Sequence, residues 1–289
     1  MTPETGTLLS LGHGYSARAL VKLLGPGWRV IGTTRTEEKV NIFKDEGVEP
    51  IIFPGHDLKP ALAEATHILA SAAPLESGDP FLEEIAEALP LSRAVWVGYL
   101  STTGVYGDHQ GGWVDEASPL SPATPRGRLR VMAERQWQVA CRNAGLPLHI
   151  FRLAGIYGPG RGPFEKVRAG TARRIIKTGQ VFSRIHVEDI AQVLQASIAA
   201  PNNDRRTAAI YNVCDDDPAP PQDVLAHAAE LLGLPPPPEV PFELAEMSPM
   251  ARSFYAESKR VRNDRIKDEL GVSLLYPSYR DGLPALMAE

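Results

Sequence analysis

The sequence predicts an α/β fold in which a doubly wound parallel sheet is followed by a smaller C-terminal part. Three features of the chain support this prediction. First, a glycine-rich turn near the start joins an apolar, strand-like segment to a helix-like one. Second, strand-like and helix-like segments alternate as far as residue 160. Third, beyond residue 160 this alternation becomes less regular and prolines become more frequent. Strands that alternate with helices at this spacing form a parallel sheet with helices on both faces, and ligands bind at the carboxyl ends of its strands.

The glycine turn lies in the segment 8–35, which reads as strand, turn, helix and second strand. Its spacing, G-x-G-x-x-A, is typical of a Rossmann dinucleotide-binding unit, although the same letters can also mark an ordinary turn. Gly12 permits the tight turn, Gly14 lets a pyrophosphate approach the backbone, and Ala17 lets the helix pack close to the strand. The helix N-terminus adds N–H groups and a partial positive charge. The residues expected to bind the cofactor here are Gly12, His13, Gly14, Tyr15, Ser16 and Ala17.

The end of the second strand predicts which dinucleotide binds. An NAD site has an acidic residue at this position for the ribose 2′-hydroxyl, whereas an arginine suits the 2′-phosphate of NADP. Here the strand ends with Thr34 and Arg35, and the first carboxylate comes at Glu37. We therefore expect NADP in preference to NAD, with Thr34 and Arg35 in the site. The alternative is that Arg35 is a solvated loop charge.

Composition and charge narrow the class of protein. The chain has 289 residues, of which 43% are hydrophobic and 22% charged, as in ordinary globular proteins. A net charge of −5 disfavours general binding to nucleic acid or membrane surfaces. No apolar run reaches spanning length, residues 1–5 carry no leader-like pattern, and Cys141 and Cys214 suggest free thiols. We expect a cytoplasmic protein with a small-molecule substrate, no nucleic-acid or membrane partner and no metal.

The chain is predicted to divide into two parts. Residues 1–160 form the dinucleotide-binding domain, and residues 161–289 mainly the substrate-binding part, with segments near 181–215 returning to the sheet. Strands are expected at 8–11, 28–35, 49–53, 67–70, 94–100, 148–153 and 209–213, and helices at 37–46, 60–64, 79–88, 126–144, 187–199, 221–232 and 258–270. Residues 174–177 read as a further short segment of unassigned type. Residues 108–125 read as a polar loop.

Several short motifs follow one another in order along nearly the whole chain. They are the glycine turn, Asp57-Leu58, Ser71-Ala72-Ala73-Pro74, Ser101-Thr102-Thr103-Gly104-Val105-Tyr106-Gly107, 152–160, 184–191 and Tyr211-Asn212-Val213. Together they resemble the motifs of the extended short-chain dehydrogenase/reductases, in the NAD-dependent epimerase/dehydratase family, and are most similar to the YeeZ-like group of nucleoside-diphosphate-sugar epimerase-type proteins.

The resemblance implies roles for residues beyond the glycine turn. They are Asp57 and Leu58 at the adenine, Ala72 and Ala73 beside the adenosine ribose, the backbone of Gly155 and Ile156 at the nicotinamide, and Thr102 as the catalytic hydroxyl. Without the resemblance, Asp57 reads equally well as a turn cap and Thr102 as a strand-end hydroxyl that bonds the backbone. In sugar-nucleotide enzymes of the family an asparagine usually stands where this chain has Gly155, which weakens a nucleotide-sugar assignment.

The helix expected at 126–144 departs from the family's pattern. A tyrosine and a lysine four residues later carry the family's chemistry, and Arg126 and Arg130 take their positions. A guanidinium stays protonated near neutral pH and is a poor acid–base catalyst, but two such cations on one helix face favour an anionic group. The alternative is a surface stripe in which Glu134 pairs with Arg130 at i,i+4.

Two functions are compatible with these features. The first is an NADP-dependent oxidoreductase or epimerase-like enzyme for a small polar or anionic substrate, with Thr102, Arg126, Arg130 and Tyr106 in the active site. Other candidate proton carriers are Asp108, His109, Tyr157 and His186. The second is a non-catalytic NADP(H)-binding redox sensor or regulator. Relatives of this kind often dimerise through the helices expected at 79–88 and 126–144, so a homodimer is expected as well.

Overall fold

The computed structural model of the protein describes residues 5–200 and 208–287. Seven parallel strands form a central sheet in the order β11-β7-β5-β4-β1-β2-β3. The strands are β1 (Gly6–Leu11), β2 (Trp28–Thr34), β3 (Val48–Ile52), β4 (His67–Ala70), β5 (Trp96–Thr102), β7 (Leu148–Leu153) and β11 (Ala209–Val213). The strand order reverses between β1 and β4, as in doubly wound folds, and this confirms the predicted α/β class.

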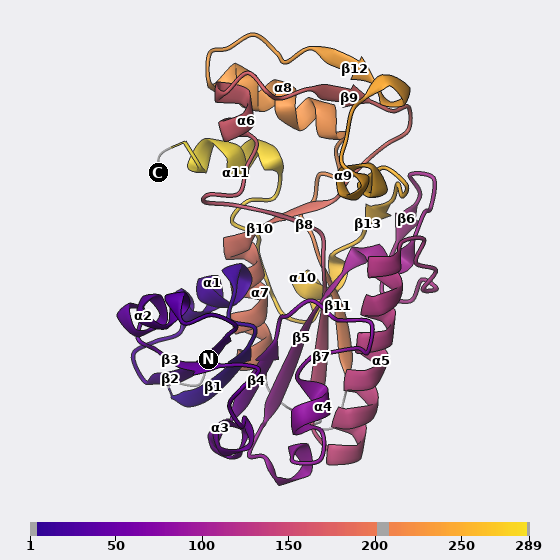
Figure 1. The fold of residues 1–289 in the computed structure, drawn as a ribbon. Coiled ribbons are helices and arrows are strands. Elements are labelled where there is room, and N and C mark those ends of the chain that lie inside the picture. Colours follow the sequence, from indigo (N-terminus) through magenta and orange to yellow (C-terminus); the bar gives the residue numbers. More distant parts are fainter. Residues whose placement is uncertain (1–4, 201–207, 288–289) are drawn as a thin grey trace.

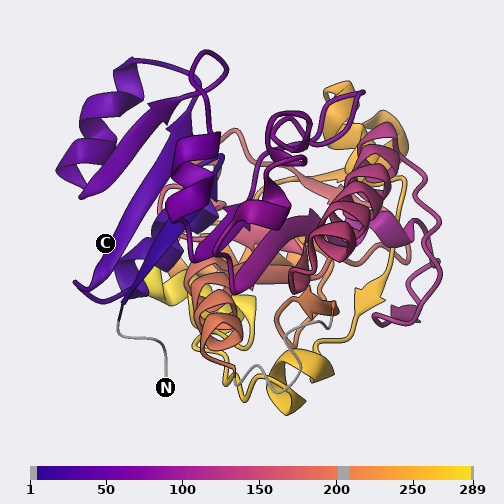
Figure 2. The same cartoon turned by 90° about the horizontal axis from the view of Figure 1, so that it is seen from below.

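Helices cover both faces of this sheet (Figures 1 and 2). One face carries α1 (Tyr15–Leu23), α2 (Glu38–Asp45) and α7 (Val187–Ala199), and the other carries α3 (Lys59–Glu64), α4 (Leu82–Ile85) and α5 (Pro125–Ala144). Successive strand residues alternate between the two cores: Leu8 packs with the first set of helices and Leu9 with the second. Both faces of a parallel sheet are buried, which explains why its strands read as nearly continuous apolar runs.

The C-terminal part lies above the carboxyl ends of the strands (Figure 1) and has its own small core. It contains β8 (Gly155–Tyr157), α6 (Phe164–Arg168), β9 (Arg174–Ile176), β10 (Arg184–His186), α8 (Pro221–Leu231), β12 (Glu239–Pro241), η3 (Phe242–Leu244), α9 (Pro249–Phe254), β13 (Arg260–Val261) and α11 (Tyr279–Ala285). The short helix α10 (Asp264–Asp268) packs against β11 of the central sheet. The parallel pairs β8–β10 and β9–β12, and the pair of β13 with β6 (Trp113–Val114), join segments that are far apart in the sequence. Ligands of the Rossmann domain would therefore lie under this part.

Three predictions of local structure were wrong. The helix expected at 79–88 is reduced to α4, and a 3₁₀ turn, η1 (Leu89–Leu91), follows it around a proline. The loop expected at 108–125 contains a two-residue strand, β6 (Trp113–Val114). The basic helix expected at 258–270 consists of β13 and the short α10, because residues near 259 are drawn out to bond other loops: Lys259 donates to Gly107 O at 2.8 Å.

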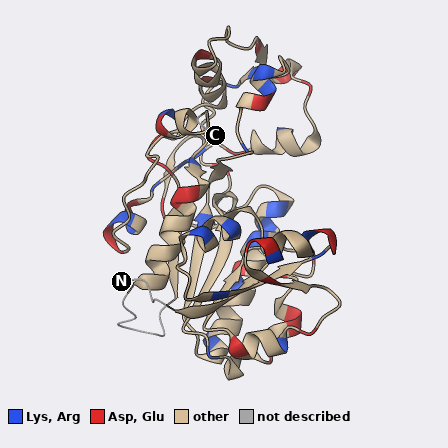
Figure 3. Cartoon of the chain, turned by 90° about the vertical axis from the view of Figure 1, so that its left-hand side faces the viewer, with Lys and Arg blue, Asp and Glu red and all other residues tan. Residues whose placement is uncertain are grey.

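Lys and Arg are interspersed with Asp and Glu over the ribbon (Figure 3). Cys141 and Cys214 are both buried and free, as expected. Within residues 5–200 and 208–287, no helix combines the length and the apolar character needed to cross a bilayer. Residues 1–4, on which the expectation of no leader partly rests, lie outside the described residues.

Candidate functional site

The glycine turn between β1 and α1 is fixed from two sides. Gly12 has a φ of +81°, and a Cβ at this position would lie 2.9 Å from the backbone nitrogen of Ala72. Thr33, near the end of β2, accepts from Gly12 N through its hydroxyl at 2.6 Å and from His13 N through its carbonyl at 3.1 Å. Both the left-handed backbone and the lack of space require glycine at position 12.

The N-terminus of α1 begins directly after this turn. Its N-cap residue, Gly14, provides no side-chain cap, and the first turn carries no acidic residue. The first N–H groups of any α-helix lack intrahelical acceptors, so the end of α1 attracts an anion. Tyr15 donates its hydroxyl to Pro159 O at 2.9 Å, and Ser16 and Ala17 are buried against the sheet. The predicted turn residues thus lie together at the carboxyl end of β1.

His13 differs from the other turn residues because its side chain belongs to the core. The ring is 5% exposed, its Nδ1 lies 3.0 Å from Ser10 Oγ, and it packs edge-on against Phe43. Burial lowers the pKa of His13 to about 4, so the imidazole is neutral. The enclosure of the ring below the turn therefore contradicts a contact between the His13 side chain and a cofactor.

The end of β2 presents a cation to solvent. Thr34 is buried and its hydroxyl accepts from Thr36 N at 3.3 Å, whereas the next side chain, Arg35, is exposed. Arg35 has neither a salt bridge nor a hydrogen-bond partner among the described residues. Because β1 and β2 pair in register, with Ser10 opposite Gly32, this cation stands at the same edge of the sheet as the glycine turn.

The residues expected around the adenosine have mixed placements. Asp57 is exposed and accepts from Lys59 N at 2.9 Å, which is the turn-cap arrangement. Leu58 is completely buried in the core between the sheet and α3, so its expected packing on adenine is contradicted by its enclosure. Ala72 is partly buried beside Gly12, and Ala73 is exposed.

Two of the proposed catalytic residues lie at the end of β5 and in the turn after it. Thr102 is partly buried, and its hydroxyl accepts from Gly104 N at 3.2 Å, which caps the short 3₁₀ helix η2 (Thr103–Tyr106). Tyr106 is completely buried: its hydroxyl donates to Asn212 Oδ1 at 2.6 Å and accepts from Arg152 Nη1 at 2.9 Å. Burial raises the pKa of Tyr106 to about 12. This enclosure contradicts a direct catalytic role for Tyr106.

A buried ion pair lies beneath this site and was missed in the sequence. Arg152 donates from Nη2 to Glu134 Oε2 at 2.9 Å, and Ser101 donates its hydroxyl to Oε1 of the same carboxylate at 2.5 Å. Glu134 therefore does not pair with Arg130, and the predicted surface stripe is wrong. The signal that could have found it is an arginine inside the apolar strand 148–153, since a buried guanidinium requires a partner.

Arg130 and Arg126 have separate contacts. Arg130 donates from Nη1 to Ala72 O at 3.0 Å, to the hydroxyl of Tyr99 at 3.0 Å and to Leu100 O at 2.9 Å, so it joins the carboxyl ends of β4 and β5. Arg126 donates to the hydroxyl of Ser253 at 2.9 Å, and its guanidinium lies 4.8 Å from the ring centre of Phe254. The first arginine thus faces the sheet edge, and the second holds α9.

The segment after β7 contains the two residues expected at the nicotinamide. Gly155 is exposed and Ile156 partly buried, and both pair with β10. His186 is 1% exposed and caps α7 by accepting from Glu188 N at 3.3 Å; its ring packs against Tyr157. His109 is only partly buried, with Nε2 at 3.3 Å from Tyr106 O.

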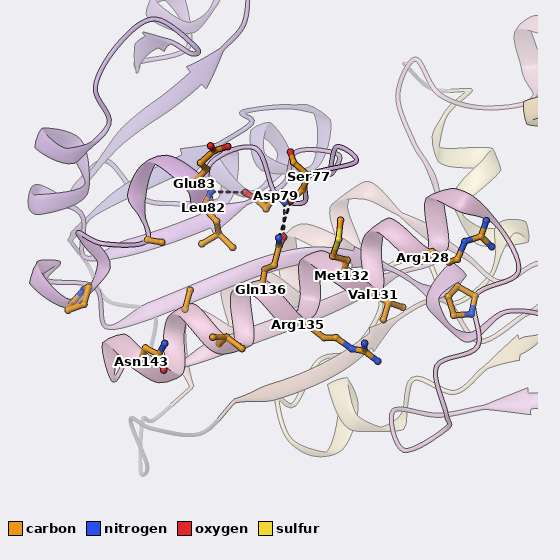
Figure 4. Close-up of a pocket in the computed structure, with 15 residues that line it drawn as sticks. Ser77, Asp79, Leu82, Glu83, Arg128, Val131, Met132, Arg135, Gln136 and Asn143 are labelled. Carbon is orange, nitrogen blue, oxygen red and sulfur yellow. Dashed lines mark hydrogen bonds between the residues drawn. The ribbon is translucent and has the colours of Figure 1, made fainter.

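A separate groove runs between α4 and α5 (Figure 4), with a volume of about 1010 Å³. The groove is lined by Ser77, Asp79, Leu82, Glu83, Ala86, Pro90, Pro122, Arg128, Val131, Met132, Arg135, Gln136, Val139, Ala140 and Asn143. None of the residues predicted to bind the cofactor or to act in catalysis is among them. The groove is therefore distinct from the site at the sheet edge.

A family model for the NAD dependent epimerase/dehydratase family matches residues 82–214, a stretch that includes β5, α5 and β7. Over this stretch the chain is similar to members of this family. Over 283 residues it is 29% identical to Protein YeeZ of Escherichia coli (strain K12), covering 92% of this chain and 95% of YeeZ. It is also 31% identical, over 188 residues, to the 3-diazoavenalumate denitrifying reductase of a Streptomyces species, covering 59% of this chain and 58% of the reductase.

Solved structures show the same fold. A conserved protein of unknown function from Silicibacter pomeroyi DSS is 60% identical, with a TM-score of 0.90 and coverage of 98% of this chain and 99% of that chain. The UDP-glucuronic acid 4-epimerase from Bacillus cereus, in complex with NAD, has a TM-score of 0.77 at 16% identity and covers 96% of both chains. The second likeness shows the fold alone.

Proposed function

We propose that the protein is an NADP-dependent oxidoreductase or epimerase-like enzyme that acts on a small polar or anionic substrate. The observation that carries this proposal is the uncapped N-terminus of the nine-residue helix α1, directly behind Gly12. The similarity to the NAD dependent epimerase/dehydratase family supports a nicotinamide dinucleotide as the anion that this helix end receives.

The residues at the glycine turn fit a pyrophosphate. A Cβ built on Gly14 would have only Gly12 O within 4 Å, at 3.6 Å, so the space in front of this residue is open. A side chain there would occupy the volume that a close-lying phosphate needs. Gly12, Gly14, Tyr15 and Ser16 would hold the pyrophosphate through their backbone, and Ala17 supports the close packing of α1.

Arg35 supports NADP as the preferred form. Its guanidinium has no competing partner among the described residues, and it follows β2 at the position where a ribose 2′-phosphate is bound in such folds. A planar guanidinium binds a phosphate through two parallel hydrogen bonds. We expect Arg35→Asp to weaken NADP binding at least tenfold more than NAD binding; equal losses for both cofactors would refute this assignment.

The bound nicotinamide would accept or donate a hydride, and the chain must then bind the substrate oxygen and move its proton. Thr102 Oγ1 is assigned to the substrate oxygen, because the hydroxyl retains its hydrogen while accepting from Gly104 N. His109 is assigned the transfer of the substrate's proton. A carbonyl oxygen only accepts, so the contact with Tyr106 O assigns the hydrogen to His109 Nε2 and leaves Nδ1 as the base.

In this proposal Arg126 and Arg130 are positioning residues, and the chain does without the family's tyrosine and lysine. Arg130 sets the distance between the loop after β4, which includes Ala72, and the end of β5, which includes Thr102. Arg126 holds α9 over the N-terminus of α5. A permanent positive charge at both positions also favours an anionic substrate.

The second candidate function is NADP(H) binding without turnover, as in a redox sensor or regulator. It is favoured by one observation: both arginines at the positions of the family's catalytic pair are bonded within the protein. In that case the loops near 108–125 and 155–183 would transmit the state of the bound cofactor.

Turnover assays distinguish the two candidates. The protein is incubated with NADPH and a panel of carbonyl compounds and sugar nucleotides, and loss of NADPH absorbance is followed. The enzyme proposal predicts substrate-dependent loss that falls about 100-fold or more in His109→Gln, whereas the exposed control His56→Gln retains it. Saturable NADPH binding with no turnover across the panel favours the sensor, and absence of NADPH binding contradicts both.

A further inference from the structure

A second cavity lies in the C-terminal part, between the loop after β8 and the helices α8 and α11. Its volume is about 310 Å³, at the lower end of the roughly 300–1,000 Å³ of small-molecule sites. The cavity is lined by Tyr157, Gly160, Arg161, Gly162, Pro163, Arg184, Val224, Tyr279 and Leu283. None of these residues belongs to the glycine turn or to the residues placed at the reacting atoms.

Arg184 is the charged group in this cavity with unused donors. Its Nη1 donates to Phe182 O at 2.8 Å and to Ala219 O at 3.0 Å, which fixes the plane of the guanidinium. For Nε and Nη2, no acceptor occurs in the part of the chain that the structure describes. These two groups form the fork that binds two oxygens of a carboxylate or phosphate.

The charge of Arg184 is not neutralised by a salt bridge. The acidic side chains that act on it electrostatically are Asp215 and Asp217, yet neither forms a salt bridge with it within residues 5–200 and 208–287. Burial raises the pKa of Asp215 to about 8, with Arg184 acting in the opposite direction, so this carboxyl is largely protonated at neutral pH. Charges removed from water are normally paired, and Arg184 has no salt-bridge partner among the described residues.

Arg161 adds a second cation at the rim of the cavity. It is exposed, and its guanidinium lies 5.9 Å from the ring centre of Tyr15. A short turn, in which Gly158 and Arg161 exchange backbone hydrogen bonds at 2.9 and 3.1 Å, keeps its backbone beside the cavity. One partly buried guanidinium and one exposed guanidinium of the same charge favour an anion small enough to enter the cavity.

We propose that this cavity binds a small oxyanion, a phosphate or a short carboxylate, with the free edge of Arg184 as its main ligand and Arg161 as a second ligand at the rim. The site is separate from the dinucleotide site. Tyr15 and Pro159 lie between the two, joined by the hydrogen bond from the tyrosine hydroxyl to the proline carbonyl.

Calorimetric titration of the full chain tests this proposal without any assay of turnover. Inorganic phosphate and acetate are titrated separately at constant ionic strength in chloride. We expect saturable binding of at least one anion, at least tenfold weaker in Arg184→Gln and about threefold weaker in Arg161→Gln. Arg168→Gln, an exposed arginine on α6 outside the cavity, is the matched control and should bind like the unchanged protein.

A second variant and a titration in the presence of NADP complete the test. Arg184→Lys retains the charge but lacks the planar fork, so weaker binding is expected even if Arg184→Gln fails to fold. The titration is repeated with saturating NADP, which fills the end of α1 but leaves the cavity open, so the affinity for the anion should persist. Binding of neither anion, equal affinities in the protein and its Arg184 variants, or complete competition by NADP would each overturn the proposal. Saturation by phosphate alone or by acetate as well identifies the anion.

Discussion

Arg152 and Glu134 form a salt bridge of 2.9 Å in which both side chains are almost completely buried. The pair joins β7 to α5 beneath the carboxyl edge of the sheet, and its partners Ser101 and Tyr106 belong to the segment that carries Thr102. The stability of the fold and the geometry of the candidate site therefore both depend on the carboxylate of Glu134.

Glu134→Gln should strongly destabilise the protein. The substitution preserves the shape of the side chain but leaves a buried guanidinium without a counter-charge, which costs about 3–5 kcal/mol. Urea unfolding monitored by circular dichroism measures the loss. Glu230→Gln is the control, because Glu230 is 78% exposed and should change stability little. A loss below about 1 kcal/mol for Glu134→Gln would show that the pair contributes little.

Acid should destabilise the protein between about pH 6.5 and pH 4. Burial lowers the pKa of His13, His67 and His149 to about 4 from an ordinary value of 6.5. Because the unfolded chain binds protons more readily at these positions, stability is complete above the unfolded pKa and falls as the pH drops toward 4. Each histidine accounts for a loss on the order of 3 kcal/mol.

Urea unfolding at several pH values tests this dependence, with His67→Phe as the informative variant. A phenyl ring preserves the contacts with Trp28 and Trp96 but takes up no proton, so this variant should lose less stability on acidification. The exposed His56→Phe is the control. Parallel pH dependences for the original protein and His67→Phe would contradict the assignment.

Arg126→Gln should loosen α9. The substitution removes the hydrogen bond to Ser253 and the stacking on Phe254, a contact of the cation–π type worth about 0.5–1 kcal/mol at an exposed site. Hydrogen exchange of the amides in 249–255 should become several-fold faster. Arg128→Gln, which loses only a bond to Ala123 O, is the matched control. Unchanged exchange in α9 would mean that other contacts hold the helix.

The groove between α4 and α5 is proposed as the contact of a homodimer. Val139, on its wall, is 53% exposed in the single chain and would be covered in such a dimer. Light scattering should give the mass of a dimer for the original protein and of a monomer for Val139→Asp. Met250→Asp changes an exposed apolar residue elsewhere and should leave the dimer intact. A monomeric original protein would refute this interface.

Strands that form from a short apolar run were predicted from the sequence with the correct bounds. The strands at 67–70, 148–153 and 209–213 have the expected bounds, since each is a short apolar run between polar turns. The segment 258–270 was predicted wrongly, because its spaced charges imitate a helix while Lys259 is held by a carbonyl 152 residues away. Contacts of that range leave no trace in local periodicity.

The site was predicted to a similar extent. The glycine turn and the cation at Arg35 follow from motif spacing, because the backbone of a few neighbouring residues builds them. The partners of Arg126, Arg130 and Glu134 do not follow from spacing: a helix presents the same i,i+4 pattern whether its face meets water or the sheet. Only the folded structure shows that Glu134 forms a salt bridge with Arg152.

The central claim is that a pyridine dinucleotide docks on the N-terminus of α1, and calorimetric titration with NADPH tests it most directly. We predict saturable binding that is lost in Gly14→Val, where a branched side chain fills the space before the helix, and retained in Gly25→Val, where nothing lies within 4 Å of the added carbon. Absence of saturable heat with NADPH and with NADH on the folded protein, or unchanged affinity in Gly14→Val, would contradict the account.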